Sequence, residues 1–283
     1  MNPPQFIIIG AMKSATSTLH DQLALQQGIF MSTPKEPNFF SDDKQYQKGL
    51  GWYQSLFSDA LPTDLCGESS THYTKLPTFP ETISRLKAYT DDIKLVYVLR
   101  HPLERLISHY IHEWSQNNIH CEINTAIKKH PELIEYSLYH KQISPFIENF
   151  GGESILISYF QKILHSPQAE LEKVCRHIGY QDHPEWNFEM KSQNVSSQRI
   201  REFPLYSLLI RSRAASTLRK LLIPKSIREK VKTRLTMTER PTLTPETQNR
   251  LETIFDSDLK RLNDMTGLGL NCKNFNSVTQ NTA

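Results

Sequence analysis

The chain has 283 residues, of which 38% are hydrophobic and 22% charged, and its formal net charge is +3. No apolar run approaches the roughly 20 residues that a membrane-spanning helix requires. The N-terminus lacks the pattern of a secretion signal, and no cysteine or histidine spacing is typical of a metal site. We therefore expect a cytoplasmic protein without a metal, with one domain over residues 1–270 and a polar, disordered tail at 271–283.

Short apolar runs alternate with helical patterns along the first two thirds of the chain. Strands are predicted at 6–9, 64–66, 93–99 and 154–159. Helices are predicted at 16–27, 79–89, 103–114, 138–150 and 168–178. Because strands that alternate with helices require crossover connections, we predict an α/β fold with a central parallel β-sheet flanked by helices.

The C-terminal part, from residue 203 onward, is predicted to be mostly helical. Thr244 and Pro245 have the residue types of an N-cap and a first helical position, and Gly267 is placed to end that helix. Basic residues outnumber acidic ones between residues 199 and 240. Such a stretch suits nucleic acid, anionic lipid headgroups at a membrane surface or a charged glycan, although a solvated helical face is the simpler explanation.

The first predicted strand leads into a turn of small and hydroxyl residues that carries Lys13. The first N–H groups of a helix have no internal partner and the helix dipole adds positive charge, so a phosphate or sulfate is the natural occupant. The lysine comes three residues after Gly10 with no glycine before it, which is not a Walker A loop. A plain buried strand whose helix is capped by Ser14 or Thr16 is the alternative.

A second basic residue, Arg100, directly follows the predicted strand at 93–99. Pro102 predicts a helix start, and Ser108 lies about two turns into that helix. Ligands of parallel sheets bind at the carboxyl ends of the strands, where Lys13 and Arg100 both fall. Two anion sites at this edge suit the two ends of a bis-phosphorylated nucleotide.

These motifs resemble the sulfotransferase family that uses 3′-phosphoadenosine 5′-phosphosulfate (PAPS). The resemblance implies a P-loop-like fold in which Arg100 and Ser108, eight residues apart, bind the 3′-phosphate. It implies that the 5′-phosphosulfate is bound by Lys13, Ser14, Ala15, Thr16, Ser17 and Thr18. Ala15 stands where the family usually has a glycine, and the conformation of this loop is therefore open.

Two further segments are similar to the heparan-sulfate-type and bacterial carbohydrate branch of that family. They are residues 35–40, with the sequence Lys-Glu-Pro-Asn-Phe-Phe, and residues 67–70, with the sequence Gly-Glu-Ser-Ser. Asn38 and Ser69 stand where the heparan branch often has a histidine and a lysine. The resemblance implies a carbohydrate or glycolipid acceptor, and the two departures weaken heparan sulfate itself as that acceptor.

The resemblance also assigns roles to single residues. It implies that Lys13 stabilises charge on the leaving oxygen, that Glu36 is the general base and that no metal is needed. His72 is the alternative base, because the loop after the strand at 64–66 is expected to reach the same edge of the sheet. Tyr159 is the candidate aromatic wall for adenine, and Arg199 is a candidate to close over the nucleotide.

Two other functions stay open from the sequence. A nucleotide kinase with an aberrant phosphate loop needs a Walker B aspartate at a strand end, and Arg100 stands there instead. A nucleic-acid-binding module would use the basic stretch at 199–240, but this stretch lacks the interleaved aromatic residues that stack on bases.

Overall fold

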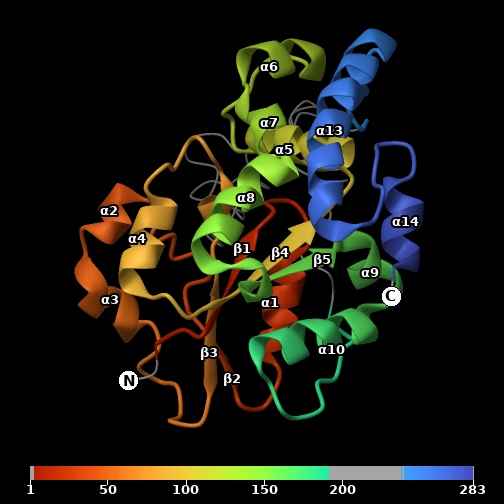
Figure 1. Ribbon diagram of the computed structural model, residues 1–283. Coiled ribbons are helices and arrows are strands. Elements are labelled where there is room, and N and C mark those ends of the chain that lie inside the picture. The colour runs from red at the N-terminus through yellow and green to blue at the C-terminus, as the bar shows by residue number, and fades with distance from the viewer. Residues whose placement is uncertain (1–2, 191–236, 238, 283) are drawn as a thin grey trace, which may run out of the picture.

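The computed structural model describes residues 3–190, 237 and 239–282 (Figure 1). The centre of this part of the chain is a five-stranded, all-parallel sheet with the strand order β2-β3-β1-β4-β5. The strands are β1 (Phe6–Gly10), β2 (Ile29–Met31), β3 (Leu65–Ser69), β4 (Lys94–Leu99) and β5 (Ile155–Tyr159). The predicted parallel α/β fold is confirmed, and β2 is the strand that the sequence pattern missed.

Strand β1 lies in the middle of the sheet, and all of its residues are buried. Phe6 is paired with Gly67 of β3 on one side and with Lys94 of β4 on the other. A Cβ on Gly67 would lie 2.1 Å from the Phe6 ring, so this register requires glycine. The close approach of β3 to β1 brings the residues that follow these strands to the same edge of the sheet.

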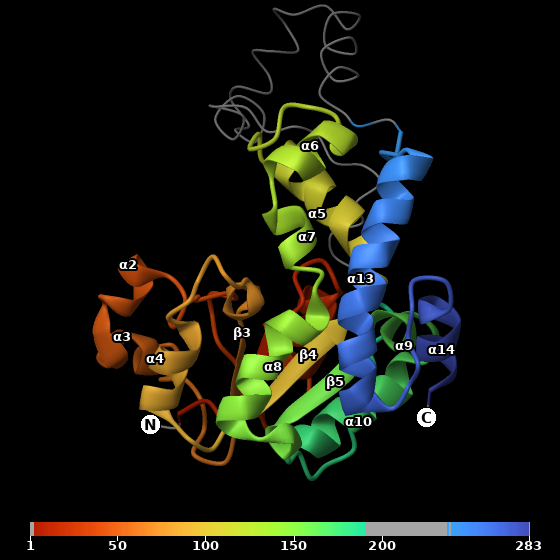
Figure 2. The same ribbon diagram turned by 45° about the horizontal axis from the view of Figure 1, so that its top comes forward.

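Hydrophobic clusters cover both faces of the sheet, because side chains along a strand point to alternate faces. Phe6 and Ile8 belong to the smaller cluster, and Ile7 and Ile9 belong to the larger one. The smaller cluster includes side chains of α1 (Thr16–Ala24) and α10 (Pro167–Ile178), and the larger one includes side chains of α5 (Pro102–Ser115), α8 (Tyr139–Phe150) and α13 (Pro245–Thr266). Figure 2 shows α8 and α13 side by side across the face that the larger cluster covers.

The other helical segments of the described residues are shorter. They are α2 (Asp43–Tyr46), α3 (Gly49–Ser55), α4 (Thr82–Tyr89), α6 (Ile123–Lys129), α7 (Glu132–Glu135), α9 (Phe160–His165), α14 (Phe275–Asn281) and the 3₁₀ turns η1 (Thr71–Thr74) and η2 (Gly152–Ser154). The predicted helices at 16–27, 79–89, 103–114, 138–150 and 168–178 correspond to α1, α4, α5, α8 and α10. Their long apolar periodicity made them predictable, whereas most of the short segments have too few turns to show one.

The C-terminal helix α13 begins as the sequence predicts. The Thr244 hydroxyl accepts a hydrogen bond from the N–H of Thr247, and Pro245 is the first helical residue. Gly267 ends the helix in a left-handed conformation with φ 69°, which glycine adopts without steric cost.

The prediction of a disordered tail at 271–283 is wrong. Residues 275–281 form α14, which lies beside α9 (Figure 1). Phe275 is buried against the His101 ring, and His101 Nε2 lies 2.7 Å from the carbonyl oxygen of Cys272. The tail is polar in composition, but a few of its residues are buried, among them Phe275 and Thr279. These residues hold the segment against the body of the protein.

Candidate active site

A cleft of about 830 Å³ opens at the edge of the sheet where β1, β3 and β4 end. Lys13 follows β1, His72 and Lys75 follow β3, and Arg100 follows β4, and all four side chains line the cleft. Crevices at the carboxyl ends of parallel strands are the usual ligand sites of such sheets. The cleft is therefore the candidate active site.

Lys13 and Arg100 are in direct contact inside this cleft. Arg100 Nη1 donates a hydrogen bond of 2.9 Å to the backbone carbonyl of Lys13. The Arg100 guanidinium lies 4.4 Å from the ring centroid of Phe160, and its Nε lies 3.5 Å from a carboxylate oxygen of Glu104. Burial lowers the pKa of Arg100, yet arginine stays charged at physiological pH. Ser108 of α5 lines the same cleft, so the structure brings the residues predicted for both phosphates together.

The loop before α1 presents backbone donors to the cleft. Ala15, Thr16, Ser17 and Thr18 all line it, and the first N–H groups of a helix have no partner within the helix. Ser14 differs from its neighbours, because its side chain is fully buried, away from the cleft lining, and its hydroxyl has no hydrogen-bond partner among the described residues. Neither Ser14 nor Thr16 caps α1: the N-cap is Ala15, without a side-chain cap. The anion-binding interpretation of this loop is thus compatible with its geometry, apart from the Ser14 hydroxyl.

Ala15 adopts a left-handed conformation with φ 65° and ψ 19°. A left-handed conformation costs an L-residue about 1–2 kcal/mol, which glycine avoids. Part of this gain is offset because glycine loses more conformational entropy than alanine on folding. We expect Ala15→Gly to raise the free energy of unfolding by up to about 1 kcal/mol, measured by urea denaturation. The matched control is Ala169→Gly on the exposed side of α10, which we expect to lower it by about 1 kcal/mol. A loss of stability in Ala15→Gly equal to that of the control would contradict this prediction.

Glu36 reaches the cleft from the loop between β2 and α2. Its backbone N–H donates to the carbonyl of Ser69 at 3.0 Å, and its carboxylate accepts hydrogen bonds from Lys35 Nζ at 2.8 Å and Thr71 Oγ1 at 3.4 Å. Burial raises the pKa of Glu36, but the positive charges of Lys35 and Lys75 outweigh that effect and hold the pKa below its ordinary value. Glu36 is therefore an ionised carboxylate in the cleft at neutral pH, as a proton acceptor must be.

His72 and Lys75 lie on the turn after β3. The His72 ring stacks on Phe79 with centroids 4.9 Å apart, and burial lowers its pKa to about 4, so the ring is neutral at physiological pH. Lys75 is only 9% exposed, and burial lowers its pKa to about 8. Sequence reasoning missed Lys75, because the predicted strand ended at Cys66 and nothing in a polar turn indicates that a lysine is buried in a cleft.

Tyr159 and Arg199, two predicted nucleotide-binding residues, are not part of the described cleft lining. Tyr159 is 4% exposed, lies outside the cleft lining and has the Lys173 ammonium 5.4 Å from its ring centroid. The next residue, Phe160, lines the cleft instead, because successive residues at a strand end point to opposite sides. Arg199, like most of the basic stretch at 199–240, lies outside the described residues.

The sequence from residue 3 to residue 265 matches the model of the sulfotransferase domain family. The chain belongs to this family. The family resemblance predicted from the motifs is thus confirmed, and the match covers the loop of Lys13, the Glu36 segment and the strand end at Arg100. Similarity to known proteins extends this result in sequence and in structure.

Among curated relatives, the chain is 30% identical over 185 residues to heparan sulfate glucosamine 3-O-sulfotransferase 3B1 of Mus musculus, with 62% of this chain and 46% of the relative covered. It is 27% identical over 187 residues to the 3-O-sulfotransferase 5 of the same organism, with 60% and 52% covered. The chain thus spans about half the length of the curated relatives it matches.

Solved structures share the fold at lower sequence identity. A sulfotransferase from Alicyclobacillus acidocaldarius superposes with a TM-score of 0.68 and 19% identity, covering 94% of this chain and 97% of the other. The sulfotransferase domain of the curacin biosynthetic pathway superposes with a TM-score of 0.53 and 17% identity, covering 89% and 97%. At these identities the similarity establishes the fold alone.

Two further features concern membrane-spanning helices and metal sites. Within the described residues, no helix is both long enough and apolar enough to cross a membrane. The same residues contain no group of three or more histidine, cysteine, aspartate or glutamate side chains arranged to hold a metal ion.

Proposed function

We propose that this protein transfers the sulfuryl group of PAPS to a hydroxyl of a carbohydrate or glycolipid acceptor. The observation that carries the proposal is the contact between Arg100 and the carbonyl of Lys13, which joins the two predicted anion-binding segments in one cleft. Family membership supports sulfuryl transfer over the nucleotide kinase that the sequence left open. The mouse sulfotransferase SULT7A1, a solved structure with the same fold, is complexed with PAP, the desulfated product of PAPS.

The donor set of the cleft fits a bis-anionic nucleotide. Lys13 and the N–H groups at the start of α1 would hold the 5′-phosphosulfate, and Arg100 and Ser108 would hold the 3′-phosphate. In place of Tyr159 we propose that Phe160 and Trp186, which both line the cleft, contact the adenine. Arginine and backbone amides supply charge and directed donors, which is what phosphate recognition requires.

Bound PAPS supplies an activated sulfuryl group. Glu36 accepts the proton of the acceptor hydroxyl as the new oxygen–sulfur bond forms, and the bond from sulfur to the 5′-phosphate oxygen breaks with its electron pair on PAP. Lys13 stabilises the negative charge that develops on that leaving oxygen. Positioning and charge stabilisation supply most of the rate enhancement in the closely related phosphoryl transfer, and the same residues are arranged to supply it here.

The acceptor side of the cleft differs from the heparan branch of the family. Ser69, which stands where that branch often has a lysine, is fully buried with its Oγ 2.9 Å from His20 Nδ1. Lys75 provides an ammonium in this cleft instead. The named activity of the curated relatives supports a sugar acceptor. The serine at position 69, in place of a lysine, supports an acceptor other than heparan sulfate.

The decisive experiment measures PAP release from PAPS by the purified protein over a panel of glycans and glycolipids, together with the thermal shift caused by PAP. We expect PAP to raise the melting temperature and at least one carbohydrate to be sulfated. Absence of any thermal shift with PAP, or ATP turnover that depends on magnesium without sulfuryl transfer, would overturn the proposal.

Lys75 allows a pH prediction, because its charge helps to hold the pKa of Glu36 low. We expect Lys75→Met to raise the Glu36 pKa towards its ordinary value, measured by NMR titration of the carboxyl carbon. A base must be deprotonated, so a higher pKa moves the acid limb of kcat/KM to higher pH. The control is Lys129→Met on the exposed side of α6, which should shift neither quantity. An unchanged Glu36 pKa in Lys75→Met would contradict the prediction.

A further inference from the structure

The loop that carries Glu36 has an unusual backbone. We call residues 35–40 the base loop. Glu36 has φ 57° and Asn38 has φ 52°, so two residues other than glycine in this loop are left-handed. Such conformations persist only where the surroundings impose them. The position of the Glu36 carboxylate therefore depends on contacts that hold the base loop from outside.

Two hydroxyl groups from the region after β3 hold the base loop. The N–H of Asn38 donates a hydrogen bond of 3.0 Å to Ser70 Oγ, and the N–H of Phe40 donates one of 3.4 Å to the hydroxyl of Tyr73. Each hydroxyl in turn donates a hydrogen bond to Glu68. Ser70 Oγ donates to Oε2 of Glu68 at 2.6 Å, and the Tyr73 hydroxyl donates to Oε1 at 2.7 Å.

Glu68 is a carboxyl group at the end of β3 and is fully buried. It forms no ion pair within the described part of the chain, where its partners are hydroxyl groups. A hydroxyl has one proton, so a hydroxyl that donates to Glu68 must present a lone pair to the backbone N–H on its other side. The two chains thus run from the N–H groups of the base loop through the hydroxyls of Ser70 and Tyr73 to the Glu68 carboxyl group.

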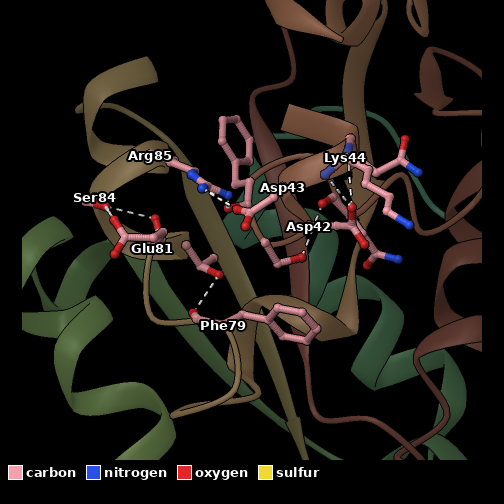
Figure 3. A network of polar contacts seen from close by, with 12 residues as sticks. Asp42, Asp43, Lys44, Phe79, Glu81, Ser84 and Arg85 are labelled. Atoms are coloured by element: carbon pink, nitrogen blue, oxygen red, sulfur yellow. Dashed lines mark hydrogen bonds and ion pairs between the residues drawn. The ribbon is translucent and has the colours of Figure 1, made fainter. Parts of the chain in front are cut away.

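The segment that follows the base loop has an anchor of its own. Arg85 of α4 donates to Oδ1 of Asp43 at 2.5 Å, and Asp42 caps α2 by accepting from the N–H groups of Lys44 and Gln45 (Figure 3). These contacts hold residues 42–46. Arg85 Nη1 also donates a hydrogen bond of 3.5 Å to the Phe40 carbonyl, at the end of the base loop. The N–H groups of Asn38 and Phe40 are held by the chains that end at Glu68.

We propose that Glu68 is a positioning residue for Glu36 and acts through Ser70 and Tyr73. This inference rests on the proposed function, in which Glu36 is the general base. Glu68 lies outside the cleft lining, so it can act on the reaction only through other residues. Its part is to keep the base loop in the one conformation that points the Glu36 carboxylate into the cleft, and displacements of about 1 Å at a reacting group can lower rates about a hundredfold.

Tyr53 and Tyr73 form a matched pair of controls within this network. Both are fully buried, and both phenols donate to Oε1 of Glu68, at 2.8 Å and 2.7 Å. Only the Tyr73 hydroxyl also accepts from the base loop. Tyr53→Phe therefore removes a comparable buried hydrogen bond from Glu68 without releasing the loop.

The experiment compares kcat, the KM for PAPS and the melting temperature of Ser70→Ala, Tyr73→Phe, Glu68→Gln and Tyr53→Phe. We expect the first three to lower kcat about tenfold to a hundredfold with little change in KM. We expect Tyr53→Phe to lower the melting temperature as much as Tyr73→Phe does but to keep most of kcat. Equal losses of kcat in Tyr53→Phe and Tyr73→Phe would overturn the proposal.

Two further measurements separate this inference from the proposed function. In the Glu36→Gln background, Ser70→Ala should lower kcat no further, because the base it positions is already removed; a further tenfold loss would contradict the inference. Amide hydrogen exchange needs no activity: Asn38 and Phe40 should exchange faster in Ser70→Ala and Tyr73→Phe than in Tyr53→Phe. Failure of PAP binding alongside this exchange pattern would sink the proposed function and leave the loop anchoring intact.

Discussion

Glu36→Gln is expected to lower kcat by about 10²–10⁴-fold, the range that a general base contributes. Glutamine has nearly the same shape as glutamate, but its amide cannot accept the proton of the acceptor hydroxyl. The hydrogen bond that the backbone N–H of residue 36 donates to the Ser69 carbonyl does not involve the side chain and should persist. The KM for PAPS and the thermal shift with PAP should therefore change little.

The control for this prediction is His72→Gln, which tests the alternative base. His72 is neutral with its pKa lowered to about 4, and its ring stacks on Phe79 at the cleft wall. We expect a loss of less than about tenfold, because packing is lost while Glu36, the proposed base, is kept. The reverse order, with His72→Gln more damaging than Glu36→Gln, would assign the base to His72.

Lys13→Ala is expected to lower kcat by about 10²–10³-fold, the usual cost of removing one donor that stabilises charge in the transition state. Lys13 lines the cleft at the start of the α1 loop, and its carbonyl is held by Arg100. Because that hydrogen bond uses the backbone, the alanine variant should keep the contact with Arg100 and still bind PAP. The expected pattern is a large fall in kcat with a smaller rise in the KM for PAPS, measured by steady-state kinetics.

Lys44→Met is the matched control for Lys13, since Lys44 is on α2 and lies outside the cleft lining. It should leave kcat within about twofold, as expected for a surface substitution. A loss of kcat below tenfold in Lys13→Ala would show that the charge on the leaving oxygen is stabilised by other groups, with the α1 N–H groups and Arg100 as the remaining donors.

Much of the fold could be predicted because local patterns determine it. β1, β4 and β5 are continuous apolar runs, as expected for strands of a parallel sheet that is buried on both faces. β2 is also apolar, but its three residues are too few to distinguish a strand from other short apolar segments. The tail at 271–283 was misjudged because its order depends on the burial of Phe275 against the His101 ring. The composition of the tail does not show that contact.

Some residues of the candidate site could likewise be predicted from the sequence, and others could not. The motifs around Lys13 and Arg100 directly follow predicted strands, so their common edge of the sheet could be predicted. Glu36 follows β2, which the sequence pattern missed, and was assigned through the family resemblance alone. Tyr159 was predicted and Phe160 was not, because the orientation of a side chain at a strand end depends on the residue at which the strand stops. Lys75 was missed because its burial comes from elements distant in the sequence.

By itself, the sequence determined most of the strands and helices in their order and the family to which the chain belongs, and it predicts an anion site at the Lys13 loop. These properties reside in short segments whose residues act on their immediate neighbours. Only the tertiary structure decided that Glu68, Ser70 and Tyr73 hold the base loop and that Lys75 faces Glu36. Such contacts join segments about 30 to 40 residues apart, and their energies depend on burial and direction, which appear once the sheet has assembled.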